Sequence, residues 1–300
     1  AMDGGLVEGA TPECLTASEL LLYQRAQEDL LSECLAEVEA GLNFSGRICS
    51  LGLIKNCRDA RGHIYGAQEN YLVPIASGFR LWLLRFLLGL YLPFFALGFL
   101  AYWILFAVLL LPAGLFLAAC DALRSSAQTN LLALLGRLEY VIALPFFSFF
   151  LFPQAILYRL FAFHPVRRPL LPFLISRPLI SGAGTLLDDG EFRLSEKGVA
   201  IRWQHRYTIA PADRPIFDCG NLLKQSMLAM MGLFRLETDH LRSLFAQEQR
   251  LQLGLADSNR ADYAEWLKIA TTRLVLEMAL DGFLQRVPKI KSPVRAVQAL

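Results

Sequence analysis

Three carboxylates near the start of the chain recur at five-residue spacing and are the first candidates for chemistry. They are Asp3, Glu8 and Glu13, in a segment that also contains Gly and Pro. A strand there could project carboxylates into one cleft, and Mg²⁺ binds carboxylate oxygens together with substrate phosphate. The spacing alone is more typical of solvated acids near a chain end, so it indicates a metal site only weakly.

Two further polar pairs stand beside apolar segments. Lys55 and Asn56 come at the end of a predicted strand, where binding residues commonly lie, and Glu69 and Asn70 directly precede an apolar run. The four histidines show no mutual spacing and are interpreted as structural or surface residues rather than metal ligands. They are His63, His164, His205 and His240.

Local patterns predict a mixture of helices and strands. A capping box at Thr16 and Glu19, followed by leucines at helical spacing, predicts a helix over 16–40. A second long amphipathic helix is expected over 261–286. Strands are expected over 46–55 and 190–203. Because these elements show no regular βαβ alternation, the fold class is predicted to be α+β.

The strongest signal is an apolar insert. No charged residue occurs from Phe86 to Cys120, and a second uncharged run extends from Tyr140 to Tyr158. The first run exceeds the roughly 20 apolar residues that cross a bilayer. Because arginines flank both runs on the outer sides, we expect a helical, transmembrane hairpin whose two ends stay on one side. A buried helical hairpin in a soluble oligomer is the alternative.

The insert divides the chain into three predicted parts. Residues 1–78 and 170–300 are expected to form the two halves of one domain, and 79–169 the hairpin between them. The hydrophobic fraction of 55% is concentrated in the insert, while the formal charge of +2 argues against nucleic-acid binding. The six cysteines lack zinc spacing. The expected location is membrane-associated, because of the insert, with the globular part in the cytoplasm.

Several blocks, in order along the chain, resemble the Pup ligase and Pup deamidase family. The resemblance covers 1–78 and 170–297, which is nearly all of the chain outside the insert. Each block alone is weak, and six blocks in the same order are specific. The six blocks are Asp3 to Cys14, Lys55-Asn56 with Tyr65 to Leu72, Leu171 to Gly184, Phe192 to Lys197, Arg214-Pro215-Ile216 and Arg250 to Asn259. The segments Leu267 to Glu277 and Ser292 to Ala296 are similar to the closing helix and strand of the family.

The resemblance implies a glutamine-synthetase-like antiparallel sheet, packed by helices, that binds ATP and Mg²⁺. It implies that Asp3 is the catalytic residue and that Glu8 and Glu69 are metal ligands. The residues placed in the cofactor-binding blocks are Lys55, Asn56, Glu69, Asn70, Arg214 and Arg250. The implied reaction is carboxylate–amine ligation, or the related hydrolysis of an amide or isopeptide, on a Pup-like protein tag or a glutamyl substrate.

The sequence also departs from the family pattern. Gln68, Gln252 and Leu6 stand at positions where the family has histidine. The segment Phe217–Gly220 stands where the family has a loop rich in arginine and acidic residues. Glutamine can bond phosphate or water but cannot carry a proton near neutral pH as histidine does. A catalytically inactive, membrane-anchored relative that binds a peptide tag or nucleotide as an adaptor is therefore the alternative hypothesis.

Overall fold

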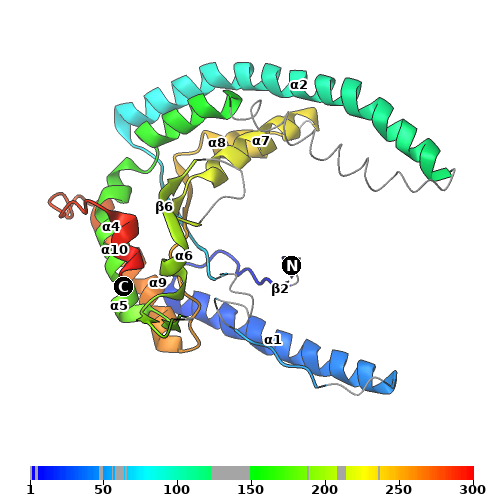
Figure 1. Ribbon diagram of the computed structural model, residues 1–300. Helices are drawn as coiled ribbons and strands as arrows, with labels where there is room; N and C mark the ends of the chain where they lie inside the picture. Colours follow the sequence, from blue (N-terminus) through cyan, green and yellow to red (C-terminus); the bar gives the residue numbers. More distant parts are fainter. Residues whose placement is uncertain are drawn as a thin grey trace.

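The computed structural model describes residues 2–3, 6–46, 50–55, 57, 64, 66–122, 149–187, 189–207, 214–235 and 237–300. These segments build a body around a four-stranded sheet, from which two long helices extend as arms in a similar direction (Figure 1). The N-terminus lies between the arms, and the C-terminus lies on the outer side of the body (Figure 1).

The central sheet joins strands from both sides of the insert. Its order is β3-β8-β7-β6, with β3 at Glu69–Pro74, β8 at Glu248–Leu253, β7 at Arg214–Asp218 and β6 at Ile201–Arg206. β3 runs antiparallel to β8 along its whole length, and β8 is antiparallel to β7. β6 and β7 are parallel. The sheet is therefore mixed, and the prediction of a purely antiparallel sheet was wrong at this edge.

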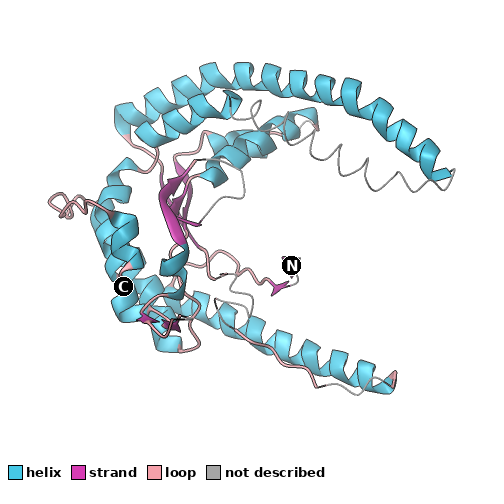
Figure 2. Ribbon diagram, in the orientation of Figure 1, coloured by secondary structure: helices cyan, strands magenta, loops and turns pink. Residues whose placement is uncertain are grey.

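Helices cover one face of this sheet, and the other face looks toward the space between the arms (Figures 1 and 2). The buried apolar side chains of the sheet and these helices belong to one continuous core. The covering helices are α4 (His164–Ser176), α5 (Pro178–Ser181), α9 (Asp262–Leu280) and α10 (Pro293–Gln298).

The lower arm is helix α1, Ala17–Phe44. Its predicted cap is confirmed, because the backbone N–H of Glu19 donates to Thr16 Oγ1 at 3.1 Å. The Glu19 carboxylate in turn accepts from the backbone N–H of Leu15 at 2.8 Å. Arg25 forms an ion pair with Asp262 of α9 and so fastens the first half of the helix to the body. The helix continues to Phe44, past the predicted end at residue 40.

The upper arm is helix α2, Gly78–Ala122, which contains Pro93 and Pro112 without ending at either. A second helix, Phe149–Phe161, lies against its first half. Phe94 and Phe150 are in ring contact with centroids 5.0 Å apart, and the Tyr91 hydroxyl donates to the carbonyl of Phe150. The return of the chain along α2 agrees with a hairpin, although residues 140–148 of the predicted second run lie outside the described residues.

One helix in the described residues is long and apolar enough to cross a membrane. It is the stretch Gly78–Leu105, with mean hydropathy 2.0 and 39% of the apolar window buried inside the protein. A bent pair, Phe149–Phe161 and His164–Ser176, passes the same test only if its two helices, 77° apart, are counted together. A core helix can meet these criteria too, so the structure does not support the predicted transmembrane hairpin beyond this one apolar helix.

Three further predicted elements differ from those of the structure. The prediction of a single strand over 190–203 was wrong, because a helical turn lies between two strands there. Likewise, the described residues 50–55 of the predicted strand 46–55 form no strand. The predicted helix 261–286 ends earlier, at Leu280. The remaining described elements are β1 (Met2–Asp3), β2 (Leu6–Val7), β4 (Thr185–Leu186), β5 (Phe192–Arg193), α6 (Glu196–Ala200), α7 (Gly220–Phe234) and α8 (Asp239–Leu244).

Candidate functional site

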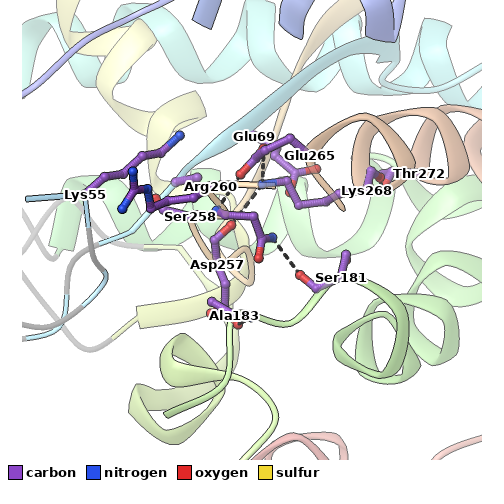
Figure 3. A network of polar contacts seen from close by, with 12 residues as sticks. Lys55, Glu69, Ser181, Ala183, Asp257, Ser258, Arg260, Glu265, Lys268 and Thr272 are labelled. Atoms are coloured by element: carbon purple, nitrogen blue, oxygen red, sulfur yellow. Dashed lines mark hydrogen bonds and ion pairs between the residues drawn. The ribbon is translucent and has the colours of Figure 1, made fainter. Parts of the chain in front are cut away.

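A buried aspartate just after β8 connects three loops. One carboxylate oxygen of Asp257 accepts from the Ser195 hydroxyl at 3.1 Å and from the backbone N–H of Lys197 at 2.9 Å. The other oxygen accepts from the backbone N–H of Ala183 at 3.1 Å. Ser195 is also the N-cap of α6. Asp257 therefore fixes the Gly-Ala-Gly loop and the start of α6 relative to the end of β8 (Figure 3).

The buried side chain of Lys268 reaches the same place from α9. Its ammonium group donates to the carbonyl oxygen of Asp257 at 2.9 Å and pairs with Glu265 at 2.6 Å. Glu265 accepts from the backbone N–H of Asn259, whose side-chain amide donates to the carbonyl of Ser181 at 2.8 Å (Figure 3). Both members of the ion pair are 2% exposed. Burial of this kind is tolerated only where the charge is paired and hydrogen-bonded.

A second buried pair joins the two sides of the insert. Arg177, at the end of α4, donates to Glu69 of β3 at 2.9 Å and to the Thr272 hydroxyl at 2.8 Å, and it also donates to the carbonyl of Leu255. Tyr71 donates its hydroxyl to the same carboxylate oxygen of Glu69 at 2.7 Å. Burial, reinforced by the negative charge of Glu69, raises the pKa of Tyr71 well above its usual value. The Glu69 side chain thus faces the covering helices and forms a buried ion pair with Arg177.

A small cavity borders this network. It measures about 10 Å³ and is lined by residues that include Arg177, Gly182, Asp257 and Lys268. A space of this size holds about one water molecule. This cavity is therefore too small for a nucleotide, and the contacts of the network position the surrounding loops.

The face of the sheet turned away from the covering helices carries a different group of polar side chains. We call it the open-face cluster: the exposed Gln68, Asn70 and Arg250, and the buried Gln252. Asn70 lies opposite Gln252, and Leu72 lies opposite Arg250, in the β3–β8 register. Because side chains alternate between faces with period two, these residues point away from Glu69 and Tyr71. The guanidinium of Arg250 donates to Asn70 Oδ1 at 2.5 Å, and Gln252 donates to Gln68 Oε1 at 2.6 Å.

An aspartate–arginine pair extends this face across the sheet. Asp218 lies opposite Gln252 in the β7–β8 register, and Arg206 of β6 lies beside Asp218. The two side chains form a bidentate ion pair, with one Nε–Oδ1 distance of 3.0 Å. Asp218 Oδ1 also accepts from the backbone N–H of Gly220 at 2.9 Å and so holds the first turn of α7. The described part of this face thus exposes the amides of Gln68 and Asn70 and the guanidinium of Arg250, while Asp218 is buried and neutralised by Arg206.

The described residues do not assemble a magnesium site. Nowhere in the described segments do three His, Cys, Asp or Glu side chains come together in a group able to hold a metal ion. Glu69 has one buried oxygen, Oε1, without a hydrogen-bond partner in the structure, but its other oxygen is held by Arg177 and Tyr71. The geometry therefore does not favour the prediction that Glu69 is a metal ligand, and Mg²⁺ stays a prediction from the resemblance.

The other predicted site residues are only partly brought together. Asp3 lies in β1, where it pairs with Leu6 of β2, and nothing is described of its side chain. Glu8 is exposed. Lys55 forms an ion pair with Glu28 of α1 at 2.7 Å and lies at one edge of the network in Figure 3. Asn56 and the side chain of Arg214 lie outside the described residues. Asn70 and Arg250, in contrast, are in direct contact.

The histidines that the structure describes take the structural or surface roles expected of them. His205 lies between the rings of Tyr207 and Phe217, with centroids 5.8 and 5.2 Å away. Burial, and then the nearby charges of Arg167 and Arg159, lowers the pKa of His205 to about 4. This imidazole is therefore neutral at physiological pH and belongs to the helix-covered side of the sheet.

Sequence reasoning did not single out the central residues of the buried network. Asp257, Lys268 and Arg177 each lie in a segment that resembles the family, but none of the three was assigned a role. A signal was present, because each is a charged residue within or directly after a mainly apolar run, such as Trp266-Leu267-Lys268-Ile269-Ala270. Charged residues in such runs are rarely buried without a specific partner.

Comparison with known proteins places these features in a family. The family model described as "Pup-ligase protein" matches residues 1–300. Pup–protein ligase of Renibacterium salmoninarum is 23% identical over 300 residues, which are 99% of this chain and 43% of that protein. Pup–protein ligase 2 of Rhodococcus erythropolis is 24% identical over 298 residues, covering 98% of this chain and 44% of that protein. The chain thus spans less than half the length of these relatives.

A solved structure shows the same fold. It is described as the Pup ligase PafA of the prokaryotic ubiquitin-like modification pathway in complex with ADP. It matches 99% of this chain and 44% of its own, with a TM-score of 0.54 and 19% sequence identity. The α+β arrangement of this chain is therefore that of a Pup-ligase-type domain.

Proposed function

Because this chain belongs to the Pup-ligase family, we propose that it forms part of an enzyme that uses ATP to join a carboxylate to an amine. The proposed substrates are the glutamyl carboxylate of a Pup-like protein tag and a lysine amine of an acceptor protein. The relatives are named Pup–protein ligases. The nucleotide proposal is supported by the ADP complex of the relative with the same fold.

The observation that carries this proposal is the assembly of the family-like blocks into one unit. Glu69, before the insert, pairs with Arg177, after it, across 108 positions of sequence. Asp257 then binds Ala183 and Ser195, and β3 pairs with β8. Blocks that are far apart in the chain therefore surround one strand pair, as a shared active site requires.

The chemistry proposed for the open-face cluster is phosphate binding. Hydrogen bonds from a guanidinium to phosphate are charge-assisted and about twice as strong as neutral ones. Arg250 is exposed, and its contact with Asn70 uses Nε. Arg250 would bind a phosphate oxygen of ATP, and the exposed amide of Gln68, held by the buried Gln252, would orient phosphate or water. In such ligations ATP phosphorylates the carboxylate and ADP is released. The amine then attacks the acyl phosphate and displaces inorganic phosphate, and Asp3 is proposed to accept the proton that the amine loses.

One observation favours a second function. The two glutamines at positions where the family has histidine, Gln68 and Gln252, are bonded to each other at 2.6 Å. Neither can carry a proton near neutral pH, and the described residues gather no metal site. A protein that binds nucleotide or tag without turnover is consistent with this arrangement. Hydrolysis of an amide or isopeptide, the reverse type of reaction, is a further variant of the enzymatic proposal.

We propose that the apolar insert holds this domain at a membrane, with the globular body on the cytoplasmic side. The support is the length and hydropathy of Gly78–Leu105. Large apolar side chains are also exposed along the rest of α2, including Val108, Leu111 and Leu115. Exposing such an apolar surface to water is unfavourable in free energy, so we expect a membrane to cover it.

The enzymatic proposal is tested by conjugation in vitro. The purified protein, ATP, Mg²⁺, a Pup-like tag ending in glutamate and a lysine-bearing acceptor are incubated, and conjugates are measured by intact mass. We expect conjugation in the wild type and a loss of about 10²- to 10⁴-fold in Asp3→Asn, the usual effect of removing a general base. The control is Asp281→Asn, an exposed aspartate at the end of α9.

The outcomes separate the candidate functions. Normal conjugation by Asp3→Asn would reject the role of Asp3. Cleavage of a preformed conjugate or tag amide, without its formation, would assign the hydrolytic variant. Binding of ATP or tag with neither reaction in the wild type would reject the enzymatic proposal in favour of the adaptor.

A further inference from the structure

A row of large exposed apolar side chains follows one face of the first half of α2. Others are exposed on the helix Phe149–Phe161, which lies beside α2 (Figure 1), where the rings of Phe149 and Phe94 have centroids 6.4 Å apart. Three rings of the row on α2 are stacked in succession, with centroid distances of 5.6 and 5.5 Å. We call these side chains the apolar stripe: Phe79, Trp82, Phe86, Leu90, Leu97, Phe149, Phe152 and Leu160, each at least half exposed.

The opposite face of the same half of α2 is part of the protein core. Leu84, Leu88 and Phe95 are each 1% exposed and belong to the core that includes the sheet and α4. A helix that crossed the membrane over 78–105 would carry this packed protein face into the lipid. The first half of α2 can therefore present only its stripe to a bilayer.

Arginines lie beside the base of the stripe. Arg80 follows Phe79 and lies 2.9 Å from His164 Nδ1 through its Nη1. Arg159 precedes Leu160, and its carbonyl accepts from the Arg167 guanidinium at 2.9 Å. Burial, and then the charges of Arg80, Arg167 and Arg168, lowers the pKa of His164, so these groups share one neighbourhood. We call Arg80, Arg159, Arg167 and Arg168 the arginine cluster.

The arginine cluster is not neutralised by nearby acids. Three of its members, Arg80, Arg159 and Arg168, are exposed. No ion pair joins any of the four to a carboxylate within the segments that the structure describes. A net positive patch next to an apolar surface is the arrangement by which peripheral proteins bind anionic lipid.

We propose that the apolar stripe and the arginine cluster together form a docking surface for an anionic bilayer, with the first half of α2 lying along the membrane surface. The stripe enters the acyl region, and the exposed Arg80, Arg159 and Arg168 contact lipid phosphates at its edge. This inference rests on the proposed membrane location and replaces a crossing helix over Gly78–Leu105 with an interfacial one. A dimer through the same surface is disfavoured, because an isologous interface would contain both arginine clusters.

Vesicle flotation tests the headgroup part of the inference. The purified protein is mixed with vesicles of phosphatidylcholine alone, or of phosphatidylcholine with one quarter phosphatidylglycerol, at physiological salt. We expect binding to the anionic vesicles to be at least about tenfold stronger, because each arginine near an anionic surface contributes attraction that is lost on neutral lipid. Arg80→Glu/Arg168→Glu should abolish that preference. Arg286→Glu/Arg295→Glu, which makes the same charge change on exposed arginines that do not flank the insert, should retain it.

The outcomes distinguish this inference from the membrane proposal on which it rests. Equal binding to both vesicle types would overturn the headgroup contact while leaving the membrane location standing. Binding to neither type of vesicle would overturn both the headgroup contact and the membrane location. A dimer that forms without lipid and is lost in a Phe86→Ser/Leu90→Ser variant would assign the stripe to contact with a second copy of the chain.

Tryptophan quenching tests the orientation of α2. Leu90 is near the middle of Gly78–Leu105, about 12 Å along the helix from Trp82 at 1.5 Å per residue. Two variants each retain one tryptophan, native Trp82 or Leu90→Trp, with every other tryptophan changed to Phe. Lipids brominated near the headgroup should quench the fluorescence of the two variants to the same extent. Lipids brominated near the chain ends should also quench the two variants to the same extent. Stronger quenching of the Leu90→Trp variant by deeply brominated lipid would show a crossing helix and overturn the interfacial orientation.

Discussion

At the scale of single residues, the two faces of the sheet have different roles. The face that the helices cover carries buried structural contacts, and the opposite face carries the candidate site. Glu69 and Asn70 are adjacent in sequence, yet Glu69 is buried against Arg177 while Asn70 is exposed beside Arg250. The period-two alternation of a strand is the reason. A pair of polar residues in the sequence therefore supplies one residue to the core and one to the candidate site.

The Arg177–Glu69 pair is expected to be required for stability. Arg177→Met leaves the Glu69 carboxylate buried at 5% exposure without its counter-ion, and such losses cost about 3–5 kcal/mol. Urea unfolding followed by far-UV circular dichroism measures the change. The double variant Arg177→Met/Glu69→Gln should recover part of it, because no uncompensated charge remains. An unfolding midpoint in Arg177→Met equal to that of the wild type would contradict the described pair.

At the scale of elements, β8 is held against β7 at a glycine. The backbone N–H of Gly254 donates to the carbonyl of Ile216 at 2.9 Å. A Cβ at this position would come within 2.1 Å of the carbonyl oxygen of Pro215, which is a backbone atom and cannot rotate away. The close approach of the two strands therefore requires glycine.

Gly254→Ala is expected to separate the two strands and to lower the free energy of unfolding by roughly 1–3 kcal/mol or more, as overpacking does. Gly89→Ala is the matched control, because nothing lies within 4 Å of its added Cβ. In the interior of α2 that change should be neutral or stabilising by up to about 1 kcal/mol. Thermal unfolding of both variants tests this, and equal melting temperatures would show that the approach of β7 and β8 is not tight.

Elements with strong local signals could be predicted from the sequence. Thr16 and Glu19 fixed the start of α1, and the long uncharged run located α2. The segment 190–203 was mispredicted because the Ser195 cap and its bond to the backbone N–H of Gly198 start a helical turn between two strands. The Ser195 hydroxyl also donates to Asp257, 62 positions away in the sequence. Local periodicity does not indicate a contact between residues so far apart.

At the scale of the whole molecule, the pairing of distant segments came from the family resemblance alone. Nothing in the periodicity of β3 indicates that it lies beside β8, roughly 180 positions later. The resemblance also placed Asn70 and Arg250 in one site, and the structure shows them in contact. It did not indicate that Glu69 faces the helices, because block likeness carries no information on side-chain direction.

The central claim is that the open face of the β3–β8 pair binds nucleotide, and hydrogen–deuterium exchange with and without ATP and Mg²⁺ tests it most directly. We expect ATP to protect peptides that cover 66–74 and 248–254, with little change in α1. In Arg250→Ala this protection should require at least about tenfold more ATP, the loss expected for one charge-assisted phosphate contact. Arg286→Ala, on an exposed loop, should behave as the wild type. Protection by ATP confined to other segments, or equal protection in Arg250→Ala, would contradict the account.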